Sequence, residues 1–589
     1  TSYLDWAIVE MASPRPVRVV IERDIYQKWY LHWFLKSLNM IPISRSASRE
    51  AIIEVGKALA QGEVVALFPE GFITRNGHLG HFQRGFELIV KEHPCSIVPF
   101  YIHGLWGTMS SYAKRRTLKA TEGRLKRVSI AFGAAITKPI DASDLKLKVM
   151  DLSYLSWHSY AQHLPSLQQA WLKRAKMMKS NTVLIEGMRE VSGYESIALN
   201  WSLQKIVKEA IGDHPNVGIL LAPSLLGVLA NMSLLSLGKV VVNLNYTNSA
   251  QALSQSLTKA EIKTVITSKR FLTELQQKDL LPAEVLQALK LIDLDLLFER
   301  RSRLKLGLQR WVVKLLPACL LQRIINKKSD PQKVAAVLFK EDTKGLAIGV
   351  QLSHRSLMSN IQQLNYSLSL DENDTLLGGM PLYDAMGFTL TFLLPLLEGL
   401  PLICYADTND TVGMAKQISQ HKITVLCHTP TIFELYRQNK RCHPLMLQSV
   451  RIAISGMEKL SDNAYKAFKE KFDIAILAGY GSTENSAMVS CNLPDVLIPS
   501  YWHIQAGQKA GSVGMPMPGT RIKIVDGKTY EELPSGEVGL VLIAGPQLML
   551  GYLDEAEKNA AAFIYIKGEP WYNSGDTGYM DADGFLFVN

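Results

Sequence analysis

Near the beginning of the chain, a proline, a glutamate, a glycine and an arginine follow a β-branched run. The order is Val64-Val65-Ala66-Leu67, then Phe68-Pro69-Glu70-Gly71, with Arg75 shortly after. Pro69 ends a strand, and Gly71 lets the backbone turn closely against a ligand. Glu70 and Arg75 then stand at a strand end, where α/β folds bind ligands, and a guanidinium suits a phosphate there. The alternative is a plain strand-to-loop turn.

Further along the chain, two glycine-containing segments follow apolar runs. They are Gly479-Tyr480-Gly481-Ser482-Thr483-Glu484 and Tyr572-Asn573-Ser574-Gly575-Asp576-Thr577-Gly578. The second presents a carboxylate, which is a natural acceptor for the two hydroxyls of a cis-diol. Each segment alone is as readily an ordinary turn as a binding site.

The elements that must position these residues alternate between helical patterns and short β-branched runs. In the first stretch we predict a helix at 48–61 and strands at 64–68, 97–103 and 127–134. A second α/β pattern starts near 181, with strands predicted at 217–221, 240–243, 264–267, 335–338, 402–405, 424–427, 452–455 and 474–478. Past 510 the strands shorten and turn residues accumulate. The fold class is therefore α/β, in four expected units: 1–145, a helical linker at 146–180, 181–510, and a β-rich subdomain at 511–589.

Size and composition narrow the class of protein. A chain of 589 residues is too long for one core, and 47% hydrophobic with 20% charged residues excludes a disordered protein. The net charge of +10 favours an acidic partner: nucleic acid, an anionic membrane surface or an acidic carrier protein. No basic-aromatic motif accompanies the charge, so we do not expect nucleic acid as a partner. Six scattered cysteines without a CxxC pair predict no zinc site and favour a reducing compartment.

The first stretch resembles the glycerophosphate acyltransferase family, whose four sequence blocks occur in a fixed order. Thr1–Trp6 matches the first block, His-x4-Asp, without its His, which we expect before Thr1. Ile43-Ser44-Arg45 matches the second block and Phe68–Gly71 the third, and the fourth is the strand that contains Pro99. The resemblance covers residues 1 to about 145 and implies a glycerophosphate-acyltransferase α/β domain.

This resemblance implies acyl transfer to a glycerol hydroxyl. In the family, a His takes the hydroxyl proton while the oxygen attacks a thioester, and a carboxylate orients the His. Asp5 would be that carboxylate, and Glu70 joins it as a catalytic candidate. Phe72 departs from the Arg or Thr usual at its place, and Arg75 would supply the charge instead. The spacing of 68–77 is similar to that of the bifunctional 2-acylglycerophosphoethanolamine acyltransferase/acyl-ACP synthetases. The substrate-binding candidates are Arg45, Phe68, Pro69, Gly71, Arg75 and Pro99.

Residues 181–589 resemble the large N-terminal part of the adenylate-forming superfamily of acyl-CoA and acyl-ACP synthetases. The segment 479–484 matches the block in which an aromatic ring stacks on adenine and a Glu reaches magnesium. The segment 572–578 matches the ribose-binding block, and Ser455–Leu460 the block that lines the purine and acyl pocket. The resemblance implies ATP and Mg²⁺ as cofactors, Glu484 as the metal ligand, and as cofactor-binding residues Thr343, Lys344, Gly345, Gly349, Glu458, Tyr480, Gly481, Thr483, Glu484 and Asp576.

The phosphate loop departs from that family. Where the family has Thr-Ser-Gly and a later Lys, this chain reads Lys340-Glu341-Asp342-Thr343-Lys344-Gly345-Leu346-Ala347-Ile348-Gly349 after a strand at 335–339. Two carboxylates beside a triphosphate are unfavourable unless a metal or Lys340 and Lys344 offset them. The family's aromatic-His pair is also changed, to Tyr383-Asp384. Either Lys344 replaces the missing lysine, or adenylation is slow or lost, and both readings stay open.

Three apolar or basic segments are relevant to whether the chain spans or contacts a membrane. Residues 217–237 and 385–405 are the most apolar, but Gly, Pro or polar residues interrupt them and favour buried core over spanning helices. Residues 300–329 carry Lys and Arg without any acid, among leucines and Trp311, with Pro317 as an interruption. The segment predicts a basic amphipathic helix on an anionic membrane; the alternative is a surface helix packed on the core.

Together these patterns predict an enzyme that re-acylates lysophospholipid, of the 2-acylglycerophosphoethanolamine type. The acyl group would come from an acyl carrier protein that the second module charges with fatty acid and ATP. In the alternative, only the acyltransferase works, and the second module docks carrier protein or membrane. The expected location is the cytoplasmic face of the inner (cell) membrane. We also expect the adenylation family's small C-terminal domain, with its catalytic lysine, to follow Asn589, so the chain as printed would be impaired in both reactions.

Overall fold

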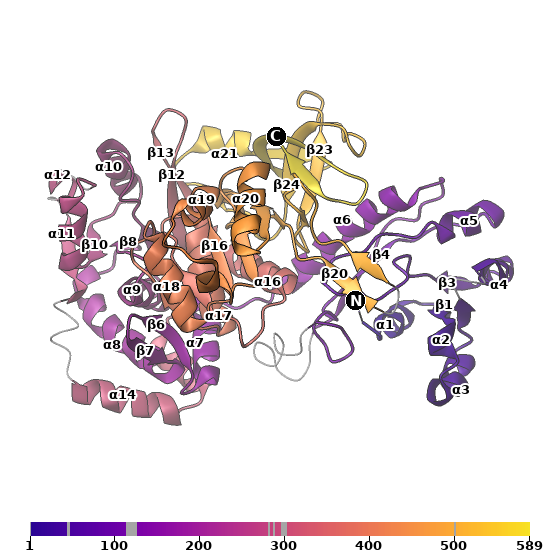
Figure 1. Cartoon of the computed structure of the whole chain (residues 1–589), viewed down its shortest axis with the longest axis horizontal. Coiled ribbons are helices and arrows are strands. Elements are labelled where there is room, and N and C mark those ends of the chain that lie inside the picture. The colour runs from indigo at the N-terminus through magenta and orange to yellow at the C-terminus, as the bar shows by residue number, and fades with distance from the viewer. Residues whose placement is uncertain are drawn as a thin grey trace.

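The structure is a computed structural model that describes residues 2–43, 48–113, 127–280, 283–286, 289–295, 303–499 and 502–589. Figure 1 shows an elongated molecule in which the N-terminal elements gather at one end of the long axis and the remaining chain forms the larger body. The predicted substrate residue Arg45 lies outside the described residues.

The N-terminal elements form a small α/β unit. β1 (Val17–Glu22) is the centre of a parallel three-stranded sheet, with β2 (Ile41–Ile43) on one side and β3 (Val64–Ala66) on the other. β4 (Phe100–His103) and β5 (Ser129–Phe132) form an antiparallel pair. The strands are shorter than predicted; Pro69 and Pro99, which cannot donate to a ladder, stand close outside β3 and β4. The helices are α1 (Asp5–Ala12), α2 (Arg23–Tyr26), α3 (Trp29–Ser37), α4 (Ser48–Ala60) and α5 (Gly85–Glu92).

Two helices join this unit to the rest. α6 (Ala142–Ala161) starts at Asp141, whose side chain accepts the Asp144 amide as an N-cap, and α7 is Leu167–Met178. Trp157 of α6 is fully buried and packs against the backbone of Gly519, far along the chain. Arg174 of α7 forms a buried ion pair with Glu398, with 3.1 Å between Nη2 and Oε2. Residues 146–180, predicted as helical, are thus an integral part of the packing between the two halves.

The larger body contains two extended sheets with helices around them (Figure 1). The first has seven strands in the order β11 (Lys290–Asp293), β10 (Thr264–Thr267), β8 (Asn216–Leu220), β9 (Val240–Asn243), β12 (Val334–Glu341), β13 (Ala347–Ser353) and β25 (Gly551–Tyr552). The second has nine, in the order β22 (Met515–Pro516), β19 (Ser490–Cys491), β18 (Ile476–Tyr480), β17 (Ile452–Ser455), β16 (Val425–His428), β14 (Leu376–Gly378), β15 (Leu402–Cys404), β6 (Thr182–Glu186) and β7 (Arg189–Ser192). The predicted α/β class is confirmed.

The helices of this body cover the sheets and the apolar core between them. They are α8 (Gly193–Ile211), α9 (Leu225–Ser236), α10 (Ala250–Lys259), α11 (Lys269–Gln277), α12 (Ala283–Leu286), α16 (His354–Leu368), α17 (Leu394–Glu398), α18 (Thr411–His421), α19 (Pro430–Gln438), α20 (Asp462–Phe472) and α21 (Ala556–Ala562). The chain also forms a π-helix, η1 (Gly387–Leu393), and two short 3₁₀ helices, η2 (Pro444–Leu447) and η3 (Thr483–Asn485).

The two most apolar stretches of the sequence are core, as predicted. The first is β8 and α9, and the second contains η1, α17 and β15, with nearly every side chain buried. Among the described helices, none combines the length and the apolar character that crossing a bilayer requires. The basic segment 303–325 forms two helices, α14 (Arg303–Leu315) and α15 (Ala318–Ile325), separated at Pro317 as the sequence indicates.

The C-terminal strands build a separate five-stranded sheet. Its order is β23 (Arg521–Val525), β24 (Gly539–Ala544), β27 (Glu569–Met580) and β26 (Phe563–Ile566), with β28 (Leu586–Val588) on β27. One further hairpin, β20 (Val496–Ile498) with β21 (His503–Gln505), leaves the larger body and reaches the N-terminal unit (Figure 1).

Candidate functional site

The Phe68–Gly71 motif forms a turn directly after β3. Gly71 has φ +71, a conformation that favours glycine, and its amide donates to the Phe68 carbonyl at 3.2 Å. The chain then folds back, so that the Gly80 amide donates to Glu70 Oε2 at 2.7 Å. Burial raises the pKa of Glu70 above its ordinary value, which the Gly80 amide partly offsets and the nearby Asp5 carboxylate increases. Glu70 is therefore a carboxylate in a fixed orientation.

Asp5 and Arg75 lie in the same region. Asp5 is buried at the start of α1, and the Ser2 amide donates to its Oδ2 at 3.0 Å. The guanidinium of Arg75 stacks on the Tyr112 ring at 3.1 Å from its centroid, and Tyr112 shares a hydrogen bond of 2.6 Å with Tyr3. Within the described part of the chain, the buried Nε of Arg75 has no hydrogen-bond partner. The structure thus gathers two carboxylates and a guanidinium that the sequence singled out.

Three other predicted residues of this site make ring or backbone contacts with neighbouring segments. The Phe68 ring packs edge-on against Phe100, with centroids 5.8 Å apart. The Pro69 carbonyl accepts the Gln83 amide, and the Pro99 carbonyl accepts the Gly133 amide, each at 2.8 Å. These contacts fix the backbone around Glu70.

The second candidate site lies at the end of β18 in the larger body. The Tyr480 hydroxyl donates to Asp576 Oδ2 of β27 at 2.5 Å, so two predicted nucleotide contacts meet. Gly481 follows in a place where a Cβ would lie 2.0 Å from the Ala487 carbonyl, and Thr483 begins the short helix η3. The aromatic and the carboxylate that the resemblance assigns to adenine and ribose are therefore neighbours.

Glu484, the predicted metal ligand, is fully buried and already holds a cation. Lys340 of β12 forms an ion pair of 2.5 Å with its Oε1, and the Tyr552 hydroxyl donates to the same oxygen at 2.8 Å. Burial alone favours the neutral acid, but Lys340 and Tyr552 outweigh it and hold the pKa of Glu484 below its ordinary value. The other oxygen, Oε2, has no hydrogen-bond partner among the described residues. No group of three or more His, Cys, Asp or Glu side chains there could hold a metal.

The predicted phosphate loop is a tight hairpin turn. The β12–β13 ladder extends through the pairs Lys340–Ile348 and Glu341–Ala347, further than the predicted strand end, which leaves only 342–346 as the turn. In the turn, Asp342 Oδ1 accepts the amides of Lys344 and Leu346, both at 2.9 Å, and Lys558 lies 3.4 Å from Oδ2. An anion-binding set of amides is thus filled by the chain's own carboxylate.

Three of the remaining cofactor candidates lie in this turn, and two lie elsewhere. Thr343, Lys344 and Gly345 lie in it, with Gly345 at φ +73, whereas Gly349 is inside β13 opposite Phe339. Glu458 accepts a hydrogen bond of 2.7 Å from Thr431 at an exposed position. Residues at the ribose end fit a nucleoside, but those at the phosphate end do not fit a magnesium triphosphate in this arrangement, because Lys340 and Asp342 occupy the places of cation and anion.

The changed pair Tyr383-Asp384 adds an unusual carboxyl group. Tyr383 meets the Tyr246 ring edge-on at 5.1 Å and shares a hydrogen bond of 3.5 Å with Thr247. Burial raises the pKa of Asp384 to about 7. Sequence reasoning named this pair as a departure but gave no role to Tyr552, although Tyr552 stands in a segment that resembles the block before the family's hinge.

Replacing Lys340 tests whether its ammonium group takes the place of a metal ion beside Glu484. In Lys340→Met the buried Glu484 carboxylate loses its partner, so the protein should be less stable by about 2–3 kcal/mol in EDTA. Added Mg²⁺ with ATP should then raise the melting temperature more in the variant than in the wild type. Lys466→Met, at an exposed position of α20 with no assigned role in either site, is the control. Equal Mg²⁺ responses in all three proteins would contradict this assignment.

Replacing Asp384 tests its raised pKa. Between pH 4 and 7 the native state keeps a proton that the unfolded chain releases, so this group's contribution to stability falls as pH rises towards 7 and stays low above it. Asp384→Asn should therefore have little effect at pH 4 and stabilise the protein at pH 8, by at most about 4 kcal/mol. Melting temperatures across this range, with the exposed Asp213→Asn as control, measure the effect. A variant that melts below the wild type at pH 8 would refute it.

Comparisons with known proteins agree with this geometry. The model of the family described as AMP-binding enzyme matches residues 206–553, more than half of the chain, and the model described as acyltransferase matches residues 1–103. A 4-coumarate–CoA ligase from Pinus taeda is 31% identical over 266 residues, 44% of this chain and 48% of that protein. A long-chain-fatty-acid–CoA ligase from Escherichia coli O157:H7 is 25% identical over 389 residues, 63% of this chain and 66% of that protein. The chain spans about half the length of the first of these relatives.

Solved structures show the same fold. An anthranilate CoA ligase in complex with anthranoyl-AMP superposes with a TM-score of 0.58 at 21% identity, over 73% of this chain and 79% of that one. A long-chain-fatty-acid-CoA ligase from Archaeoglobus fulgidus gives 0.58 at 19% identity, over 72% and 83%. With the match over more than half of its length, the chain belongs to the AMP-binding enzyme family and carries an acyltransferase domain in front of its AMP-binding domain.

Proposed function

We propose that the protein re-acylates lysophospholipid of the 2-acylglycerophosphoethanolamine type, with an acyl carrier protein as acyl donor. The observation that carries the proposal is the arrangement beside the Phe68–Gly71 turn: the Glu70 carboxyl is oriented by the Gly80 amide close to Asp5, and Arg75 stacks on Tyr112, the hydrogen-bond partner of Tyr3. Asp5 would orient a general-base His, Glu70 and Arg75 would hold the glycerophosphate portion, and the base would take the proton of the attacking glycerol hydroxyl. In this first candidate the second module would also activate fatty acid with ATP, which requires the Lys340–Glu484 ion pair and the Asp342 contacts to rearrange.

A second candidate keeps only the acyl transfer. In it, the AMP-binding module does not adenylate and instead docks the carrier protein or the membrane. The Lys340–Glu484 ion pair and the turn filled by Asp342 favour this candidate, because both oppose a magnesium triphosphate. The basic character of the chain suits an acidic carrier protein in either case.

The two candidates predict different products from two donors. The natural full-length protein is given lysophosphatidylethanolamine with either preformed acyl-ACP, or free fatty acid, ATP, Mg²⁺ and carrier protein, and the diacyl product is quantified. The first candidate predicts product from both donors; the second predicts product from acyl-ACP alone. Glu70→Gln should lower transfer about a hundredfold, as expected when a group that positions the glycerophosphate portion is lost. No product from either donor would refute both candidates.

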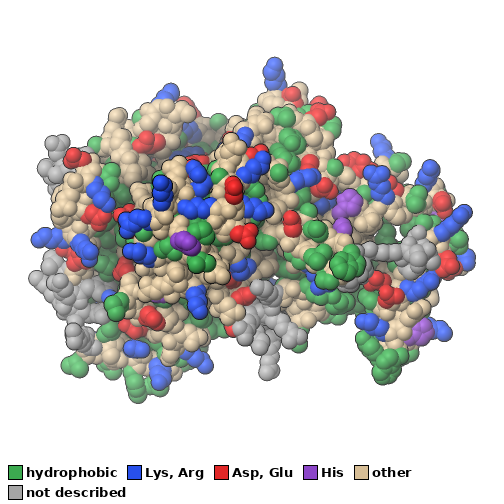
Figure 2. Space-filling view, in the orientation of Figure 1, with side chains coloured by type: hydrophobic (Ala, Val, Ile, Leu, Met, Phe, Trp, Pro, Cys, Tyr) green, Lys and Arg blue, Asp and Glu red, His purple; other side chains and the backbone are tan. Residues whose placement is uncertain are grey.

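We further propose that the enzyme works at the cytoplasmic face of the inner membrane, on the surface of anionic lipid. Trp29 and Trp33 of α3 are 86% and 70% exposed and share a face with Tyr30 and Phe34, while residues 27–39 contain lysines and no acid. α14 exposes a stripe of Leu304, Leu308, Trp311 and Leu315 among basic residues. Figure 2 shows these apolar side chains at the two ends of the lower edge. Tryptophans beside lysines suit the headgroup region of an anionic bilayer.

Removing the α3 tryptophans tests this surface. Trp29→Ser with Trp33→Ser should weaken binding to vesicles that contain phosphatidylglycerol, by about tenfold for each indole, because burial of its apolar area is worth about 1.5 kcal/mol. Flotation at two salt concentrations measures it, and binding of the wild type should fall at high salt. Met188→Ser, which removes an exposed apolar side chain from the β6–β7 turn, is the control. Unchanged binding of the tryptophan variant would exclude α3 as a membrane contact.

A further inference from the structure

The segment that follows Glu70 is polar, irregular and buried. Thr74, Asn76 and His78 are each exposed by less than a tenth, yet the segment belongs to no helix or strand. Buried polar groups without hydrogen bonds cost free energy, so such a segment needs partners from outside. Within the segment, Thr74 Oγ1 donates to the His78 carbonyl at 2.8 Å and accepts the Gly77 amide at 3.1 Å, and Asn76 Oδ1 accepts the His78 amide at 3.1 Å. The His78 ring also lies 3.3 Å from Ser367 Oγ of the AMP-binding module.

The main outside partner is Gln505 of β21, in the AMP-binding module. Its carboxamide, 3% exposed, accepts the Arg75 amide at 2.8 Å through Oε1. Its Nε2 donates to Thr74 Oγ1 at 2.9 Å, to Asn76 Oδ1 at 2.7 Å and to the His78 carbonyl at 3.3 Å. One glutamine from the second module thus contacts four polar groups of the acyltransferase segment, three of them through the two N–H bonds of its amide.

Two contacts with aromatic rings also hold this segment. Phe72, which departs from the acyltransferase pattern, stacks obliquely on His503 of β21, with ring centroids 5.5 Å apart. Gly77 has φ +83 and lies against Trp106 and Tyr366; a Cβ there would lie 2.9 Å from the Trp106 ring. The aromatic residue at position 72 therefore packs on a ring that the second module supplies.

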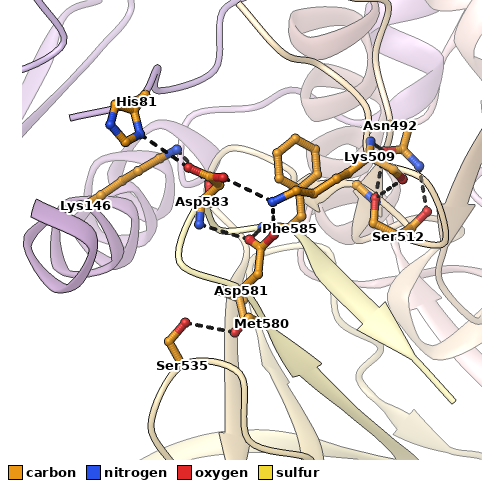
Figure 3. A network of polar contacts seen from close by, with 11 residues as sticks. His81, Lys146, Asn492, Lys509, Ser512, Ser535, Met580, Asp581, Asp583 and Phe585 are labelled. Atoms are coloured by element: carbon orange, nitrogen blue, oxygen red, sulfur yellow. Dashed lines mark hydrogen bonds and ion pairs between the residues drawn. The ribbon is translucent and has the colours of Figure 1, made fainter. Parts of the chain in front are cut away.

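The far end of the segment is held as well (Figure 3). His81 Nδ1 lies 3.4 Å from Asp583 Oδ1, on the turn between β27 and β28, and the buried Lys146 ammonium donates to the Asp583 carbonyl at 2.7 Å. Lys509 pairs with Asp581 and, at 3.1 Å, with Asp583. Partial burial disfavours the charge of Asp583, but Lys509 outweighs it and holds its pKa below the ordinary value. Gly80, whose amide donates to Glu70 Oε2, lies in the chain between the residues that Gln505 contacts and His81.

We propose that Gln505 is a positioning residue for the acyltransferase site: it seats residues 74–78 so that the Gly80 amide keeps the Glu70 carboxylate in its binding orientation. The acyltransferase site is then completed by the AMP-binding module, whether or not that module adenylates. This inference rests on the acyl transfer proposed above. The AMP-binding module would then contribute to acyl transfer only by positioning residues of the acyltransferase site.

The test compares Gln505→Met and Gln505→Ala with the wild type in the natural full-length protein. Methionine keeps the length of the side chain but none of its hydrogen bonds, so it guards against a variant that fails to fold. Ile504→Ala, on the same strand with an exposed side chain, is the matched control. Acyl transfer from preformed acyl-ACP is measured in detergent micelles, with the lysophospholipid and the acyl-ACP concentrations varied separately.

For Gln505→Met we expect kcat/KM for lysophospholipid to fall by about tenfold to a hundredfold, as for a misplaced binding group. The KM for lysophospholipid should rise while the KM for acyl-ACP stays unchanged, whereas a smaller folded fraction would lower kcat and change neither KM. Trypsin should cut at the Arg75–Asn76 bond faster in the variant than in the wild type or Ile504→Ala, because release of the segment exposes it.

Wild-type kinetics and wild-type cleavage in Gln505→Met would overturn the inference, as would equal losses for both substrates. If the wild-type protein transfers no acyl group, the proposed function fails by that result alone. The role of Gln505 in acyl transfer is then refuted as well, and trypsin cleavage decides whether Gln505 still holds residues 74–78 in place.

Discussion

Buried polar backbone must find hydrogen-bond partners, and in this protein that requirement joins the two modules. The segment after Glu70 has too few internal partners to lie buried by itself, and Gln505 from the AMP-binding module provides them. Because the Gly80 amide at the end of this segment orients Glu70, the arrangement of one candidate site depends on a side chain from the other half of the chain. The fusion of the two modules thus has a structural consequence beyond bringing two activities together.

The AMP-binding module combines a complete scaffold with an altered phosphate end. The sheets form an adenylate-forming fold, which the similarity to solved ligases supports, and the nucleotide candidates Tyr480 and Asp576 are in contact. At the phosphate end, Lys340 provides the positive charge at Glu484, and Asp342 fills the turn amides. Lys340 neutralises a carboxylate that would otherwise attract a metal ion, and Asp342 occupies amides that would otherwise attract a phosphate.

Much of the fold was predictable because strands with continuous apolar, β-branched runs carry a strong local signal. The predicted strands 240–243, 264–267 and 452–455 agree with β9, β10 and β17. The sequence also named Asp5, Glu70 and Arg75 as candidates, because they stand in or beside motifs that resemble a known family. It could not pair Lys340 with Glu484, because that contact depends on how β12 and η3 meet in space. Nor did it single out Gln505, since a glutamine in a turn-rich stretch has no local pattern that distinguishes it from a solvated side chain.

Hydrogen–deuterium exchange of the wild-type full-length protein tests the joined site most directly. The amides of Arg75, Gly77, His78 and Gly80 all donate to side-chain acceptors in the structure. The account predicts that these amides exchange as slowly as those of β4 in the same domain, although they belong to no helix or strand. Exchange at the rate of an open surface loop would show that the second module does not hold this segment, and would contradict the central claim.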